Sequence, residues 1–136
     1  MPLRILGLAA LAAMLSQVSL GAKAQTYIFD ATKRNPALLR AWQAIAPKDY
    51  ARQEWISKLE GVTTPMDSIS MHGKPFYLGA VCIPHDCGGN FVALLIAKDG
   101  KEAHGALSSE TLGVRLRYFG APDSEARRLL SDKLAN

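Results

Sequence analysis

The sequence predicts an α+β domain: an antiparallel five-stranded meander sheet flanked by helices, an α/β/α-type sandwich with a disulfide-closed hairpin loop. Two observations predict these layers. Apolar residues recur at helical spacing before residue 64, and from there on they follow the period of two that is typical of strands. Helical spacing returns at the end of the chain, so helices are expected both before and after the strands in the sequence.

The first 24 residues have the features of a secretory signal peptide. Arg4 supplies the positive start, Ile5–Met14 is an apolar run, and Ala22-Lys23-Ala24 is a small-x-small cleavage site. The apolar run is shorter than the ~20 residues that a membrane-spanning helix needs, so no membrane anchor is expected after cleavage. We therefore expect a single domain, residues 25–136, in the periplasm.

Cleavage changes both the size and the charge of the chain. It leaves 136 − 24 = 112 residues, enough for one domain with one core. It also removes Arg4 and Lys23, so Lys plus Arg falls from 16 to 14 against 12 acidic residues, and the net charge falls from +4 to +2. No basic stripe with interleaved aromatic residues is present, so no nucleic-acid partner is expected. We expect no cofactor, and the sequence leaves the oligomeric state open, a homodimer included.

A short extended start at residues 26–30 is expected to lead into a helix. Asn35 as N-cap and Pro36 at the first helical position predict where this helix begins, and Pro47 ends it. A second helical pattern begins near Asp49, with Gly61 as its C-cap. The apolar sides of the two helices include both tryptophans, which are expected to lie in the core. These sides comprise Leu38, Leu39, Trp42 and Ile45, then Tyr50, Trp55, Ile56 and Leu59.

Five strands and a last helix follow. A turn is expected at residues 72–74, and Asp99-Gly100 predicts a two-residue type I′ hairpin turn. In the last strand Leu112, Val114, Leu116 and Tyr118 are expected on one face. Pro122-Asp123-Ser124 opens the final helix. The predicted strands are residues 66–71, 75–82, 90–98, 101–107 and 111–119.

The stretch CIPHDC lies between the second and third predicted strands. It holds the two cysteines of the chain, Cys82 and Cys87, and an oxidising compartment favours a disulfide between them. Pro84 restricts the backbone, so the ring presents His85 on a stiff loop, which lowers the entropy cost of any contact that the imidazole makes. Alternatively the loop only stabilises the hairpin, with Asp86 accepting a hydrogen bond from the Gly88 N–H and His85 solvated.

Three chemical alternatives give His85 another role. A metal site built from both thiolates and His85 has three ligands where structural zinc takes four, and no metal is expected. A periplasmic metal-binding protein that uses His72, His85 and His104 is the second metal hypothesis. An enzyme that pairs His85 and Asp86 with Ser108 or Ser109 as nucleophile is not expected, because neighbours in a tight loop rarely form a base and its orienting partner.

CIPHDC resembles the CKPHDC loop of the Ivy family, the periplasmic inhibitors of vertebrate lysozyme. Cys82, Pro84, His85, Asp86 and Cys87 match that motif, and Gly88 follows it. The likeness extends over most of the exported chain. It includes the signal peptide, the amphipathic helix, the segment around Trp55, Thr64-Pro65 before the first strand, and the strands on both sides of the loop.

The resemblance implies that the loop, from Cys82 through Ile83 to Cys87, enters the active-site cleft of c-type lysozyme. There His85 would hydrogen-bond to both catalytic carboxyl groups and act as the key inhibitory residue. A lytic transglycosylase of the bacterium is the alternative partner, since it also holds a catalytic carboxyl group in a cleft. Ile83 departs from the family lysine: it removes a cation that would attract an acidic cleft, although it can pack on an apolar cleft wall. Because c-type lysozymes are themselves basic, a net charge of +2 provides no overall steering.

Overall fold

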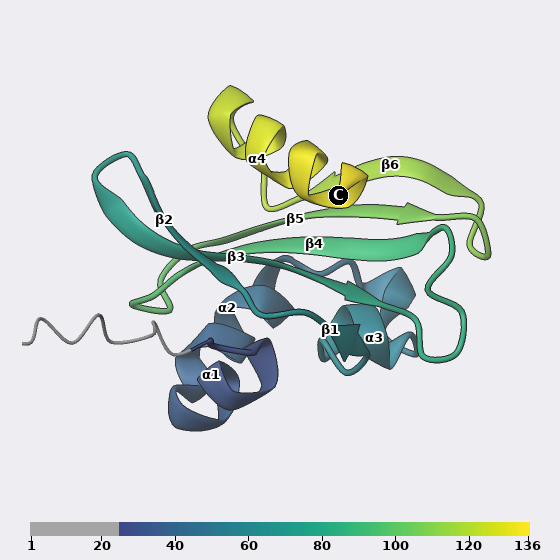
Figure 1. The fold of residues 1–136 in the computed structure, drawn as a ribbon, viewed down its shortest axis with the longest axis horizontal. Helices are drawn as coiled ribbons and strands as arrows, with labels where there is room; N and C mark the ends of the chain where they lie inside the picture. The colour runs from purple at the N-terminus through teal and green to yellow at the C-terminus, as the bar shows by residue number, and fades with distance from the viewer. Residues whose placement is uncertain (1–24) are drawn as a thin grey trace, which may run out of the picture.

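One antiparallel sheet lies between two layers of helices in the computed structural model, which describes residues 25–136 (Figure 1). Three α-helices cover one face of the sheet and the C-terminal helix covers the other, which confirms the predicted α/β/α arrangement. The expected signal peptide lies outside the described residues. Within those residues, none of the helices is long and apolar enough to cross a membrane.

The sheet has six strands in meander order. The first two, β1 and β2, pair with different parts of the same edge of β3, so they occupy the place of one predicted strand. The spatial order is β1-β3-β4-β5-β6, and β2 also pairs with β3. β1 pairs with the end of β3 at Cys82 and β2 with its beginning at Lys74, on the edge of β3 that β4 leaves free. Pro65 lies between β1 and β2, as suits an edge strand that needs no N–H there. The strands are β1 (Val62–Thr63), β2 (Asp67–Met71), β3 (Lys74–Cys82), β4 (Asn90–Ala97), β5 (Ala103–Ser109) and β6 (Val114–Phe119).

The first helical layer begins earlier than the sequence predicts. α1 (Ile28–Arg34) occupies the expected extended start, because Ile28 and Ala31, three residues apart, both turn into the core. Only Thr26 keeps an extended bridge, to Met66 of the segment before β2. α2 (Pro36–Ile45) confirms its predicted start: the Asn35 side chain accepts a hydrogen bond from the Ala37 N–H at 3.2 Å.

The second predicted helix is two short pieces. The 3₁₀ turn η1 (Lys48–Tyr50) is followed by α3 (Glu54–Ser57). Gly61 is not its C-cap. Leu59 takes the positive φ of 57° instead, and Gly61 lies so close to β3 that a Cβ atom would be 2.4 Å from the carbonyl oxygen of Cys82. The glycine is therefore needed for backbone contact with the sheet.

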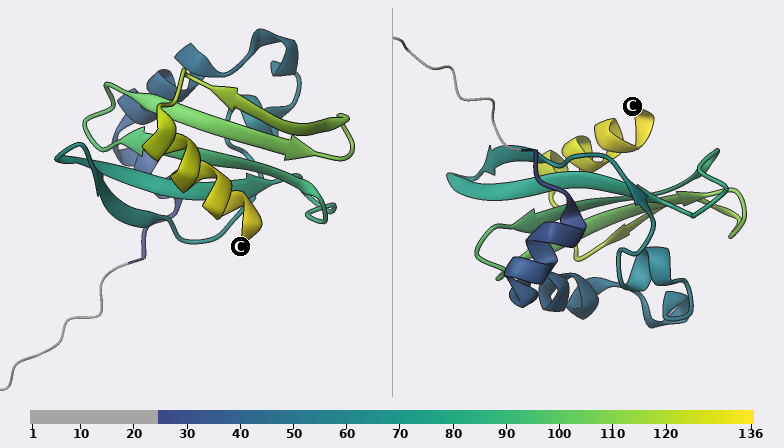
Figure 2. Two further views of the ribbon diagram at one scale, coloured as in Figure 1. Left: turned by 90° about the horizontal axis from the view of Figure 1, so that it is seen from above. Right: turned by 60° about the horizontal axis from the view of Figure 1, so that its bottom comes forward.

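Both tryptophans are in the core, as predicted. Trp42 is fully buried and donates its indole N–H to the Ile56 carbonyl at 2.6 Å, while Trp55 is 3% exposed. These residues belong to the core between the sheet and α1–α3. A second core lies under α4 (Ser124–Ala135), which crosses the opposite face (Figure 2). Asp123 caps α4 by accepting the Ala126 N–H at 2.9 Å, which confirms the predicted start.

Of the two predicted hairpin turns, the one at residues 72–74 is confirmed, and the one at Asp99-Gly100 is wrong in type. β4 and β5 are joined through residues 98–102, and of Asp99 and Gly100 only the glycine has positive φ, so the turn is not type I′. At the β2–β3 turn, by contrast, His72 and Gly73 both have positive φ, at 53° and 72°.

The last strand does not keep its apolar residues on one face. A register shift between Leu107 and Ser109 of β5 interrupts the pairing with β6. Val114 therefore packs with the α1–α3 core and Tyr118 with the α4 core, while Leu116 is 49% exposed.

Candidate functional site

The segment from Ile83 to Gly89 joins β3 to β4 at one end of the sheet, beside the β5–β6 turn (Figure 1). Cys82 and Cys87 form the predicted disulfide, with their Cα atoms 5.0 Å apart. Cys82 is the last residue of β3 and is buried. The disulfide therefore ties the loop directly to the framework of the sheet.

A tight turn holds His85 at the tip of the ring. The Asp86 N–H donates to the Ile83 carbonyl at 3.2 Å, and His85 has φ of 67°. With Pro84 at the second position and positive φ at the third, this is a type II turn. Histidine is among the residues that adopt this conformation more readily than most. The side chain of His85 is exposed.

Asn90, the first residue of β4, fastens the loop from behind. It is 1% exposed, and its amide nitrogen donates to the carbonyl oxygens of Asp86 at 3.2 Å and Gly88 at 3.3 Å. Its amide oxygen accepts from the Ser109 hydroxyl at 2.6 Å and from the Thr111 N–H at 3.1 Å. One buried amide thus connects the loop to the β5–β6 turn.

The β5–β6 turn completes this bracket. Ser109 is fully buried, and its hydroxyl oxygen also accepts the Leu112 N–H at 3.2 Å. The Glu110 N–H donates to the Gly89 carbonyl at 2.9 Å. Sequence reasoning missed the role of Asn90 and considered Ser109 only as a nucleophile. The sequence did contain a signal: Asn90 begins one apolar strand and Ser109 ends the next, and both residues are polar.

Two side chains of the ring differ from what the sequence suggests. The Asp86 carboxylate is exposed and accepts no hydrogen bond from Gly88, so within residues 25–136 the brace is Asn90 instead. Ile83 is half-buried and packs against the α1–α3 core. Its hydrocarbon therefore anchors the base of the loop, and little of it is left to meet a partner.

The three histidines lie apart. His72 contacts Asp123 at 2.7 Å near the start of α4, and the hydrogen bond to this carboxylate raises the pKa of His72 above its ordinary value. His104 contacts the Gly120 carbonyl at 2.7 Å and Glu102 at 2.8 Å. In residues 25–136 no group of three or more His, Cys, Asp or Glu side chains is arranged to hold a metal ion.

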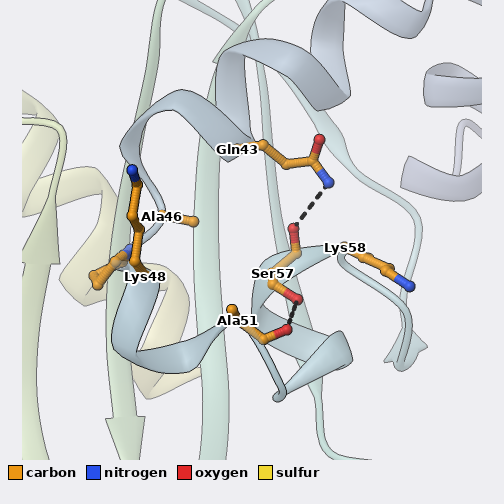
Figure 3. A pocket seen from close by; sticks show the side chains of 7 residues that line it. Gln43, Ala46, Lys48, Ala51, Ser57 and Lys58 are labelled. Carbon is orange, nitrogen blue, oxygen red and sulfur yellow. Dashed lines mark hydrogen bonds between the residues drawn. The ribbon is translucent and has the colours of Figure 1, made fainter.

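Two surface hollows differ in the residues that line them and in their position relative to the disulfide ring. One, of about 270 Å³, lies between α2 and α3, and its polar groups bond to each other: Gln43 donates to the Ser57 carbonyl, and the Ser57 hydroxyl to the Ala51 carbonyl (Figure 3). The other, of about 510 Å³, has Pro84 and His85 in its wall. Only the second of these two adjoins the ring.

Comparison with known proteins identifies relatives over most of the chain. The family described as "Inhibitor of vertebrate lysozyme (Ivy)" matches residues 37–134. A protein of Pseudomonas aeruginosa named "Inhibitor of vertebrate lysozyme" is 30% identical over 142 aligned residues, which cover 96% of this chain and 92% of that protein. An uncharacterised protein of Yersinia pestis is 22% identical over 111 residues, covering 74% of this chain and 72% of its own.

Proposed function

Because the chain belongs to the family of inhibitors of vertebrate lysozyme, we propose that it is exported to the periplasm and inhibits c-type lysozyme with the Cys82–Cys87 loop. In this proposal the first 24 residues are removed on export and residues 25–136 form the inhibitor. The loop enters the active-site cleft, and His85 is the key inhibitory residue. The protein binds the enzyme and carries out no reaction of its own.

The observation that carries this proposal is the presentation of His85. The imidazole is exposed on a type II turn, while the disulfide and the Asn90 amide hold the backbone behind it. A loop that is already ordered loses less conformational entropy when it binds than a flexible loop does.

The chemistry of the imidazole suits a glycosidase that retains configuration. Such an enzyme holds its two catalytic carboxyl groups about 5 Å apart, one protonated as the acid and one ionised. A neutral imidazole has one N–H donor and one nitrogen acceptor. His85 accepts from the protonated carboxyl group and donates to the ionised one, so a single side chain occupies both catalytic groups.

The test is inhibition of a c-type lysozyme on bacterial cell walls by the purified protein with its disulfide formed. His85→Ala should weaken binding by about 30-fold or more, the loss expected of a central interface residue. His85→Gly is the matched control, because glycine accepts φ of 67° and removes the same imidazole without strain. Equal losses in both variants support the hydrogen-bonding role, whereas full inhibition by either one refutes it.

A further inference from the structure

Building on the proposed function, we propose that the hollow between the ring and α1 is a second contact with the same lysozyme. In this contact the hollow receives an apolar side chain from the rim of the enzyme's cleft while His85 occupies the carboxyl groups inside. The side chains that line the hollow include those of Phe29, Leu59, Val62, Pro84 and His85, together with Glu60.

The exposure of two side chains is the first argument. Phe29 is 66% exposed and Val62 is 53% exposed, and they are the two most exposed large hydrophobic residues of the described chain. Both line this one hollow. The side chains by which α1 packs into the core are Ile28 and Ala31. The phenyl ring of Phe29 is therefore not needed for the packing of this helix. Neighbouring exposed apolar groups in a concave site are typical of an interaction surface.

The hollow is fixed to the ring by backbone pairing. Val62 of β1 lies opposite Cys82 of β3, so a residue that lines the hollow pairs with the residue that begins the disulfide ring. Gly61 packs directly against the Cys82 carbonyl and Val81. A partner that fits the ring therefore meets the hollow at a constant distance, without having to order either element.

The size of the ring shows that the partner must reach beyond it. A stable protein–protein interface uses roughly 20–30 residues on each side, and the loop from Ile83 to Gly89 is far smaller. The contact must therefore extend onto the flanks of the loop. On one flank lie Glu110 of the β5–β6 turn and Arg115 of β6; on the other lie Phe29 and Val62. The apolar centre of an interface is expected on the second flank.

The lysozyme is the occupant that this placement selects. Pro84 and His85 belong at once to the ring and to the wall of the hollow, so the hollow is continuous with the proposed inhibitory interface. A cleft that encloses the ring has walls on both sides of it. One of these walls rests on Val62 and Phe29.

The test compares Phe29→Ala, Val62→Thr and the control Leu116→Ala by inhibition of the same c-type lysozyme. Phe29→Ala should weaken inhibition about tenfold, because a buried phenyl ring is lost, and Val62→Thr should weaken it about fourfold, for one buried methyl group. Leu116 is also an exposed large hydrophobic residue, at 49%, but it lies on β6 and does not line the hollow, so its variant should inhibit like the original protein. Melting temperatures should not change, since all three side chains are exposed.

The outcomes separate this inference from the proposed function. If the original protein inhibits and His85→Ala does not, but Phe29→Ala and Val62→Thr inhibit within twofold of the original, the second contact is refuted and the function stands. Equal weakening by Leu116→Ala also refutes it. No inhibition by the original protein overturns both proposals.

Discussion

Replacing Asn90 with alanine should loosen the ring and lower both stability and inhibition. The Asn90 side chain forms four hydrogen bonds: two to carbonyl oxygens of the loop and two from Ser109 and Thr111. Because Asn90 is 1% exposed and Ser109 is fully buried, the Ser109 hydroxyl has no ready contact with bulk water when the amide is removed. The loop then keeps its disulfide but loses its attachment to the β5–β6 turn.

The loss of stability depends on whether each former hydrogen-bond partner of Asn90 can bond to water instead. Asp86 and Gly88 are exposed, so their carbonyl oxygens find water and each lost bond costs about 0.5 kcal/mol, the lower end of the usual range. Ser109 is fully buried, and losing its acceptor costs about 1–3 kcal/mol. With the Thr111 N–H, the total is about 3 kcal/mol, a large share of the roughly 5–15 kcal/mol by which domains are stable.

Urea denaturation measures this loss, and the inhibition constant measures the effect on the loop. Thr111→Ala is the matched control, because Thr111 contributes only its backbone N–H and that bond survives the substitution. Inhibition by Asn90→Ala should fall at least tenfold at a temperature where the variant is fully folded. If the variant loses less than about 1 kcal/mol and inhibits normally, Asn90 does not hold the loop.

Two further perturbations act on single contacts. Replacing both cysteines with alanine opens a six-residue ring. Urea denaturation should show a loss of about 2 kcal/mol of stability, and the lysozyme assay should show inhibition weakened tenfold or more. A variant that inhibits normally would show that the Asn90 hydrogen bonds alone hold the loop in place. His72→Asn keeps the positive φ and removes the imidazole beside Asp123. Because the pKa of His72 is raised, its stabilising contribution is complete below its ordinary pKa of about 6.5 and is lost as the pH rises through the raised value. Melting curves should separate variant and original at about pH 5.5 and coincide at about pH 9, and an equal gap at both would contradict the ion pair.

Short-range signals explain what the sequence predicted well. Asn35-Pro36 and Asp123 mark helix starts because each cap is a contact with a backbone N–H two or three residues away. The disulfide also joins near neighbours, five residues apart. Such contacts are formed within one turn of chain, so the residue types alone specify them.

The missed features depend on pairing between distant residues. Asn90 meets Ser109 only because β4 and β5 align in that register, and the register shift after Leu107 sends Val114 and Tyr118 to different cores. Ile28 and Ala31 form a helix because a core receives them, although residues 26–30 look extended. In each case tertiary contact decides among local options that the sequence leaves open.

The structure also changes how the substitution of Ile83 is understood. Since Ile83 packs against the core, the ring exchanges the family lysine for an anchor at its own base. The charged residues of the ring and of the hollows on its two flanks are Asp86, Glu60 and Glu110, with Arg115 as the cation. Three of these four residues are acidic, although the exported chain is expected to carry +2 overall. A basic enzyme is attracted by the potential of the surface that it approaches rather than by net charge. For the basic lysozyme proposed as partner, the absence of a lysine at position 83 adds to this local attraction during approach but removes one attraction inside the acidic cleft.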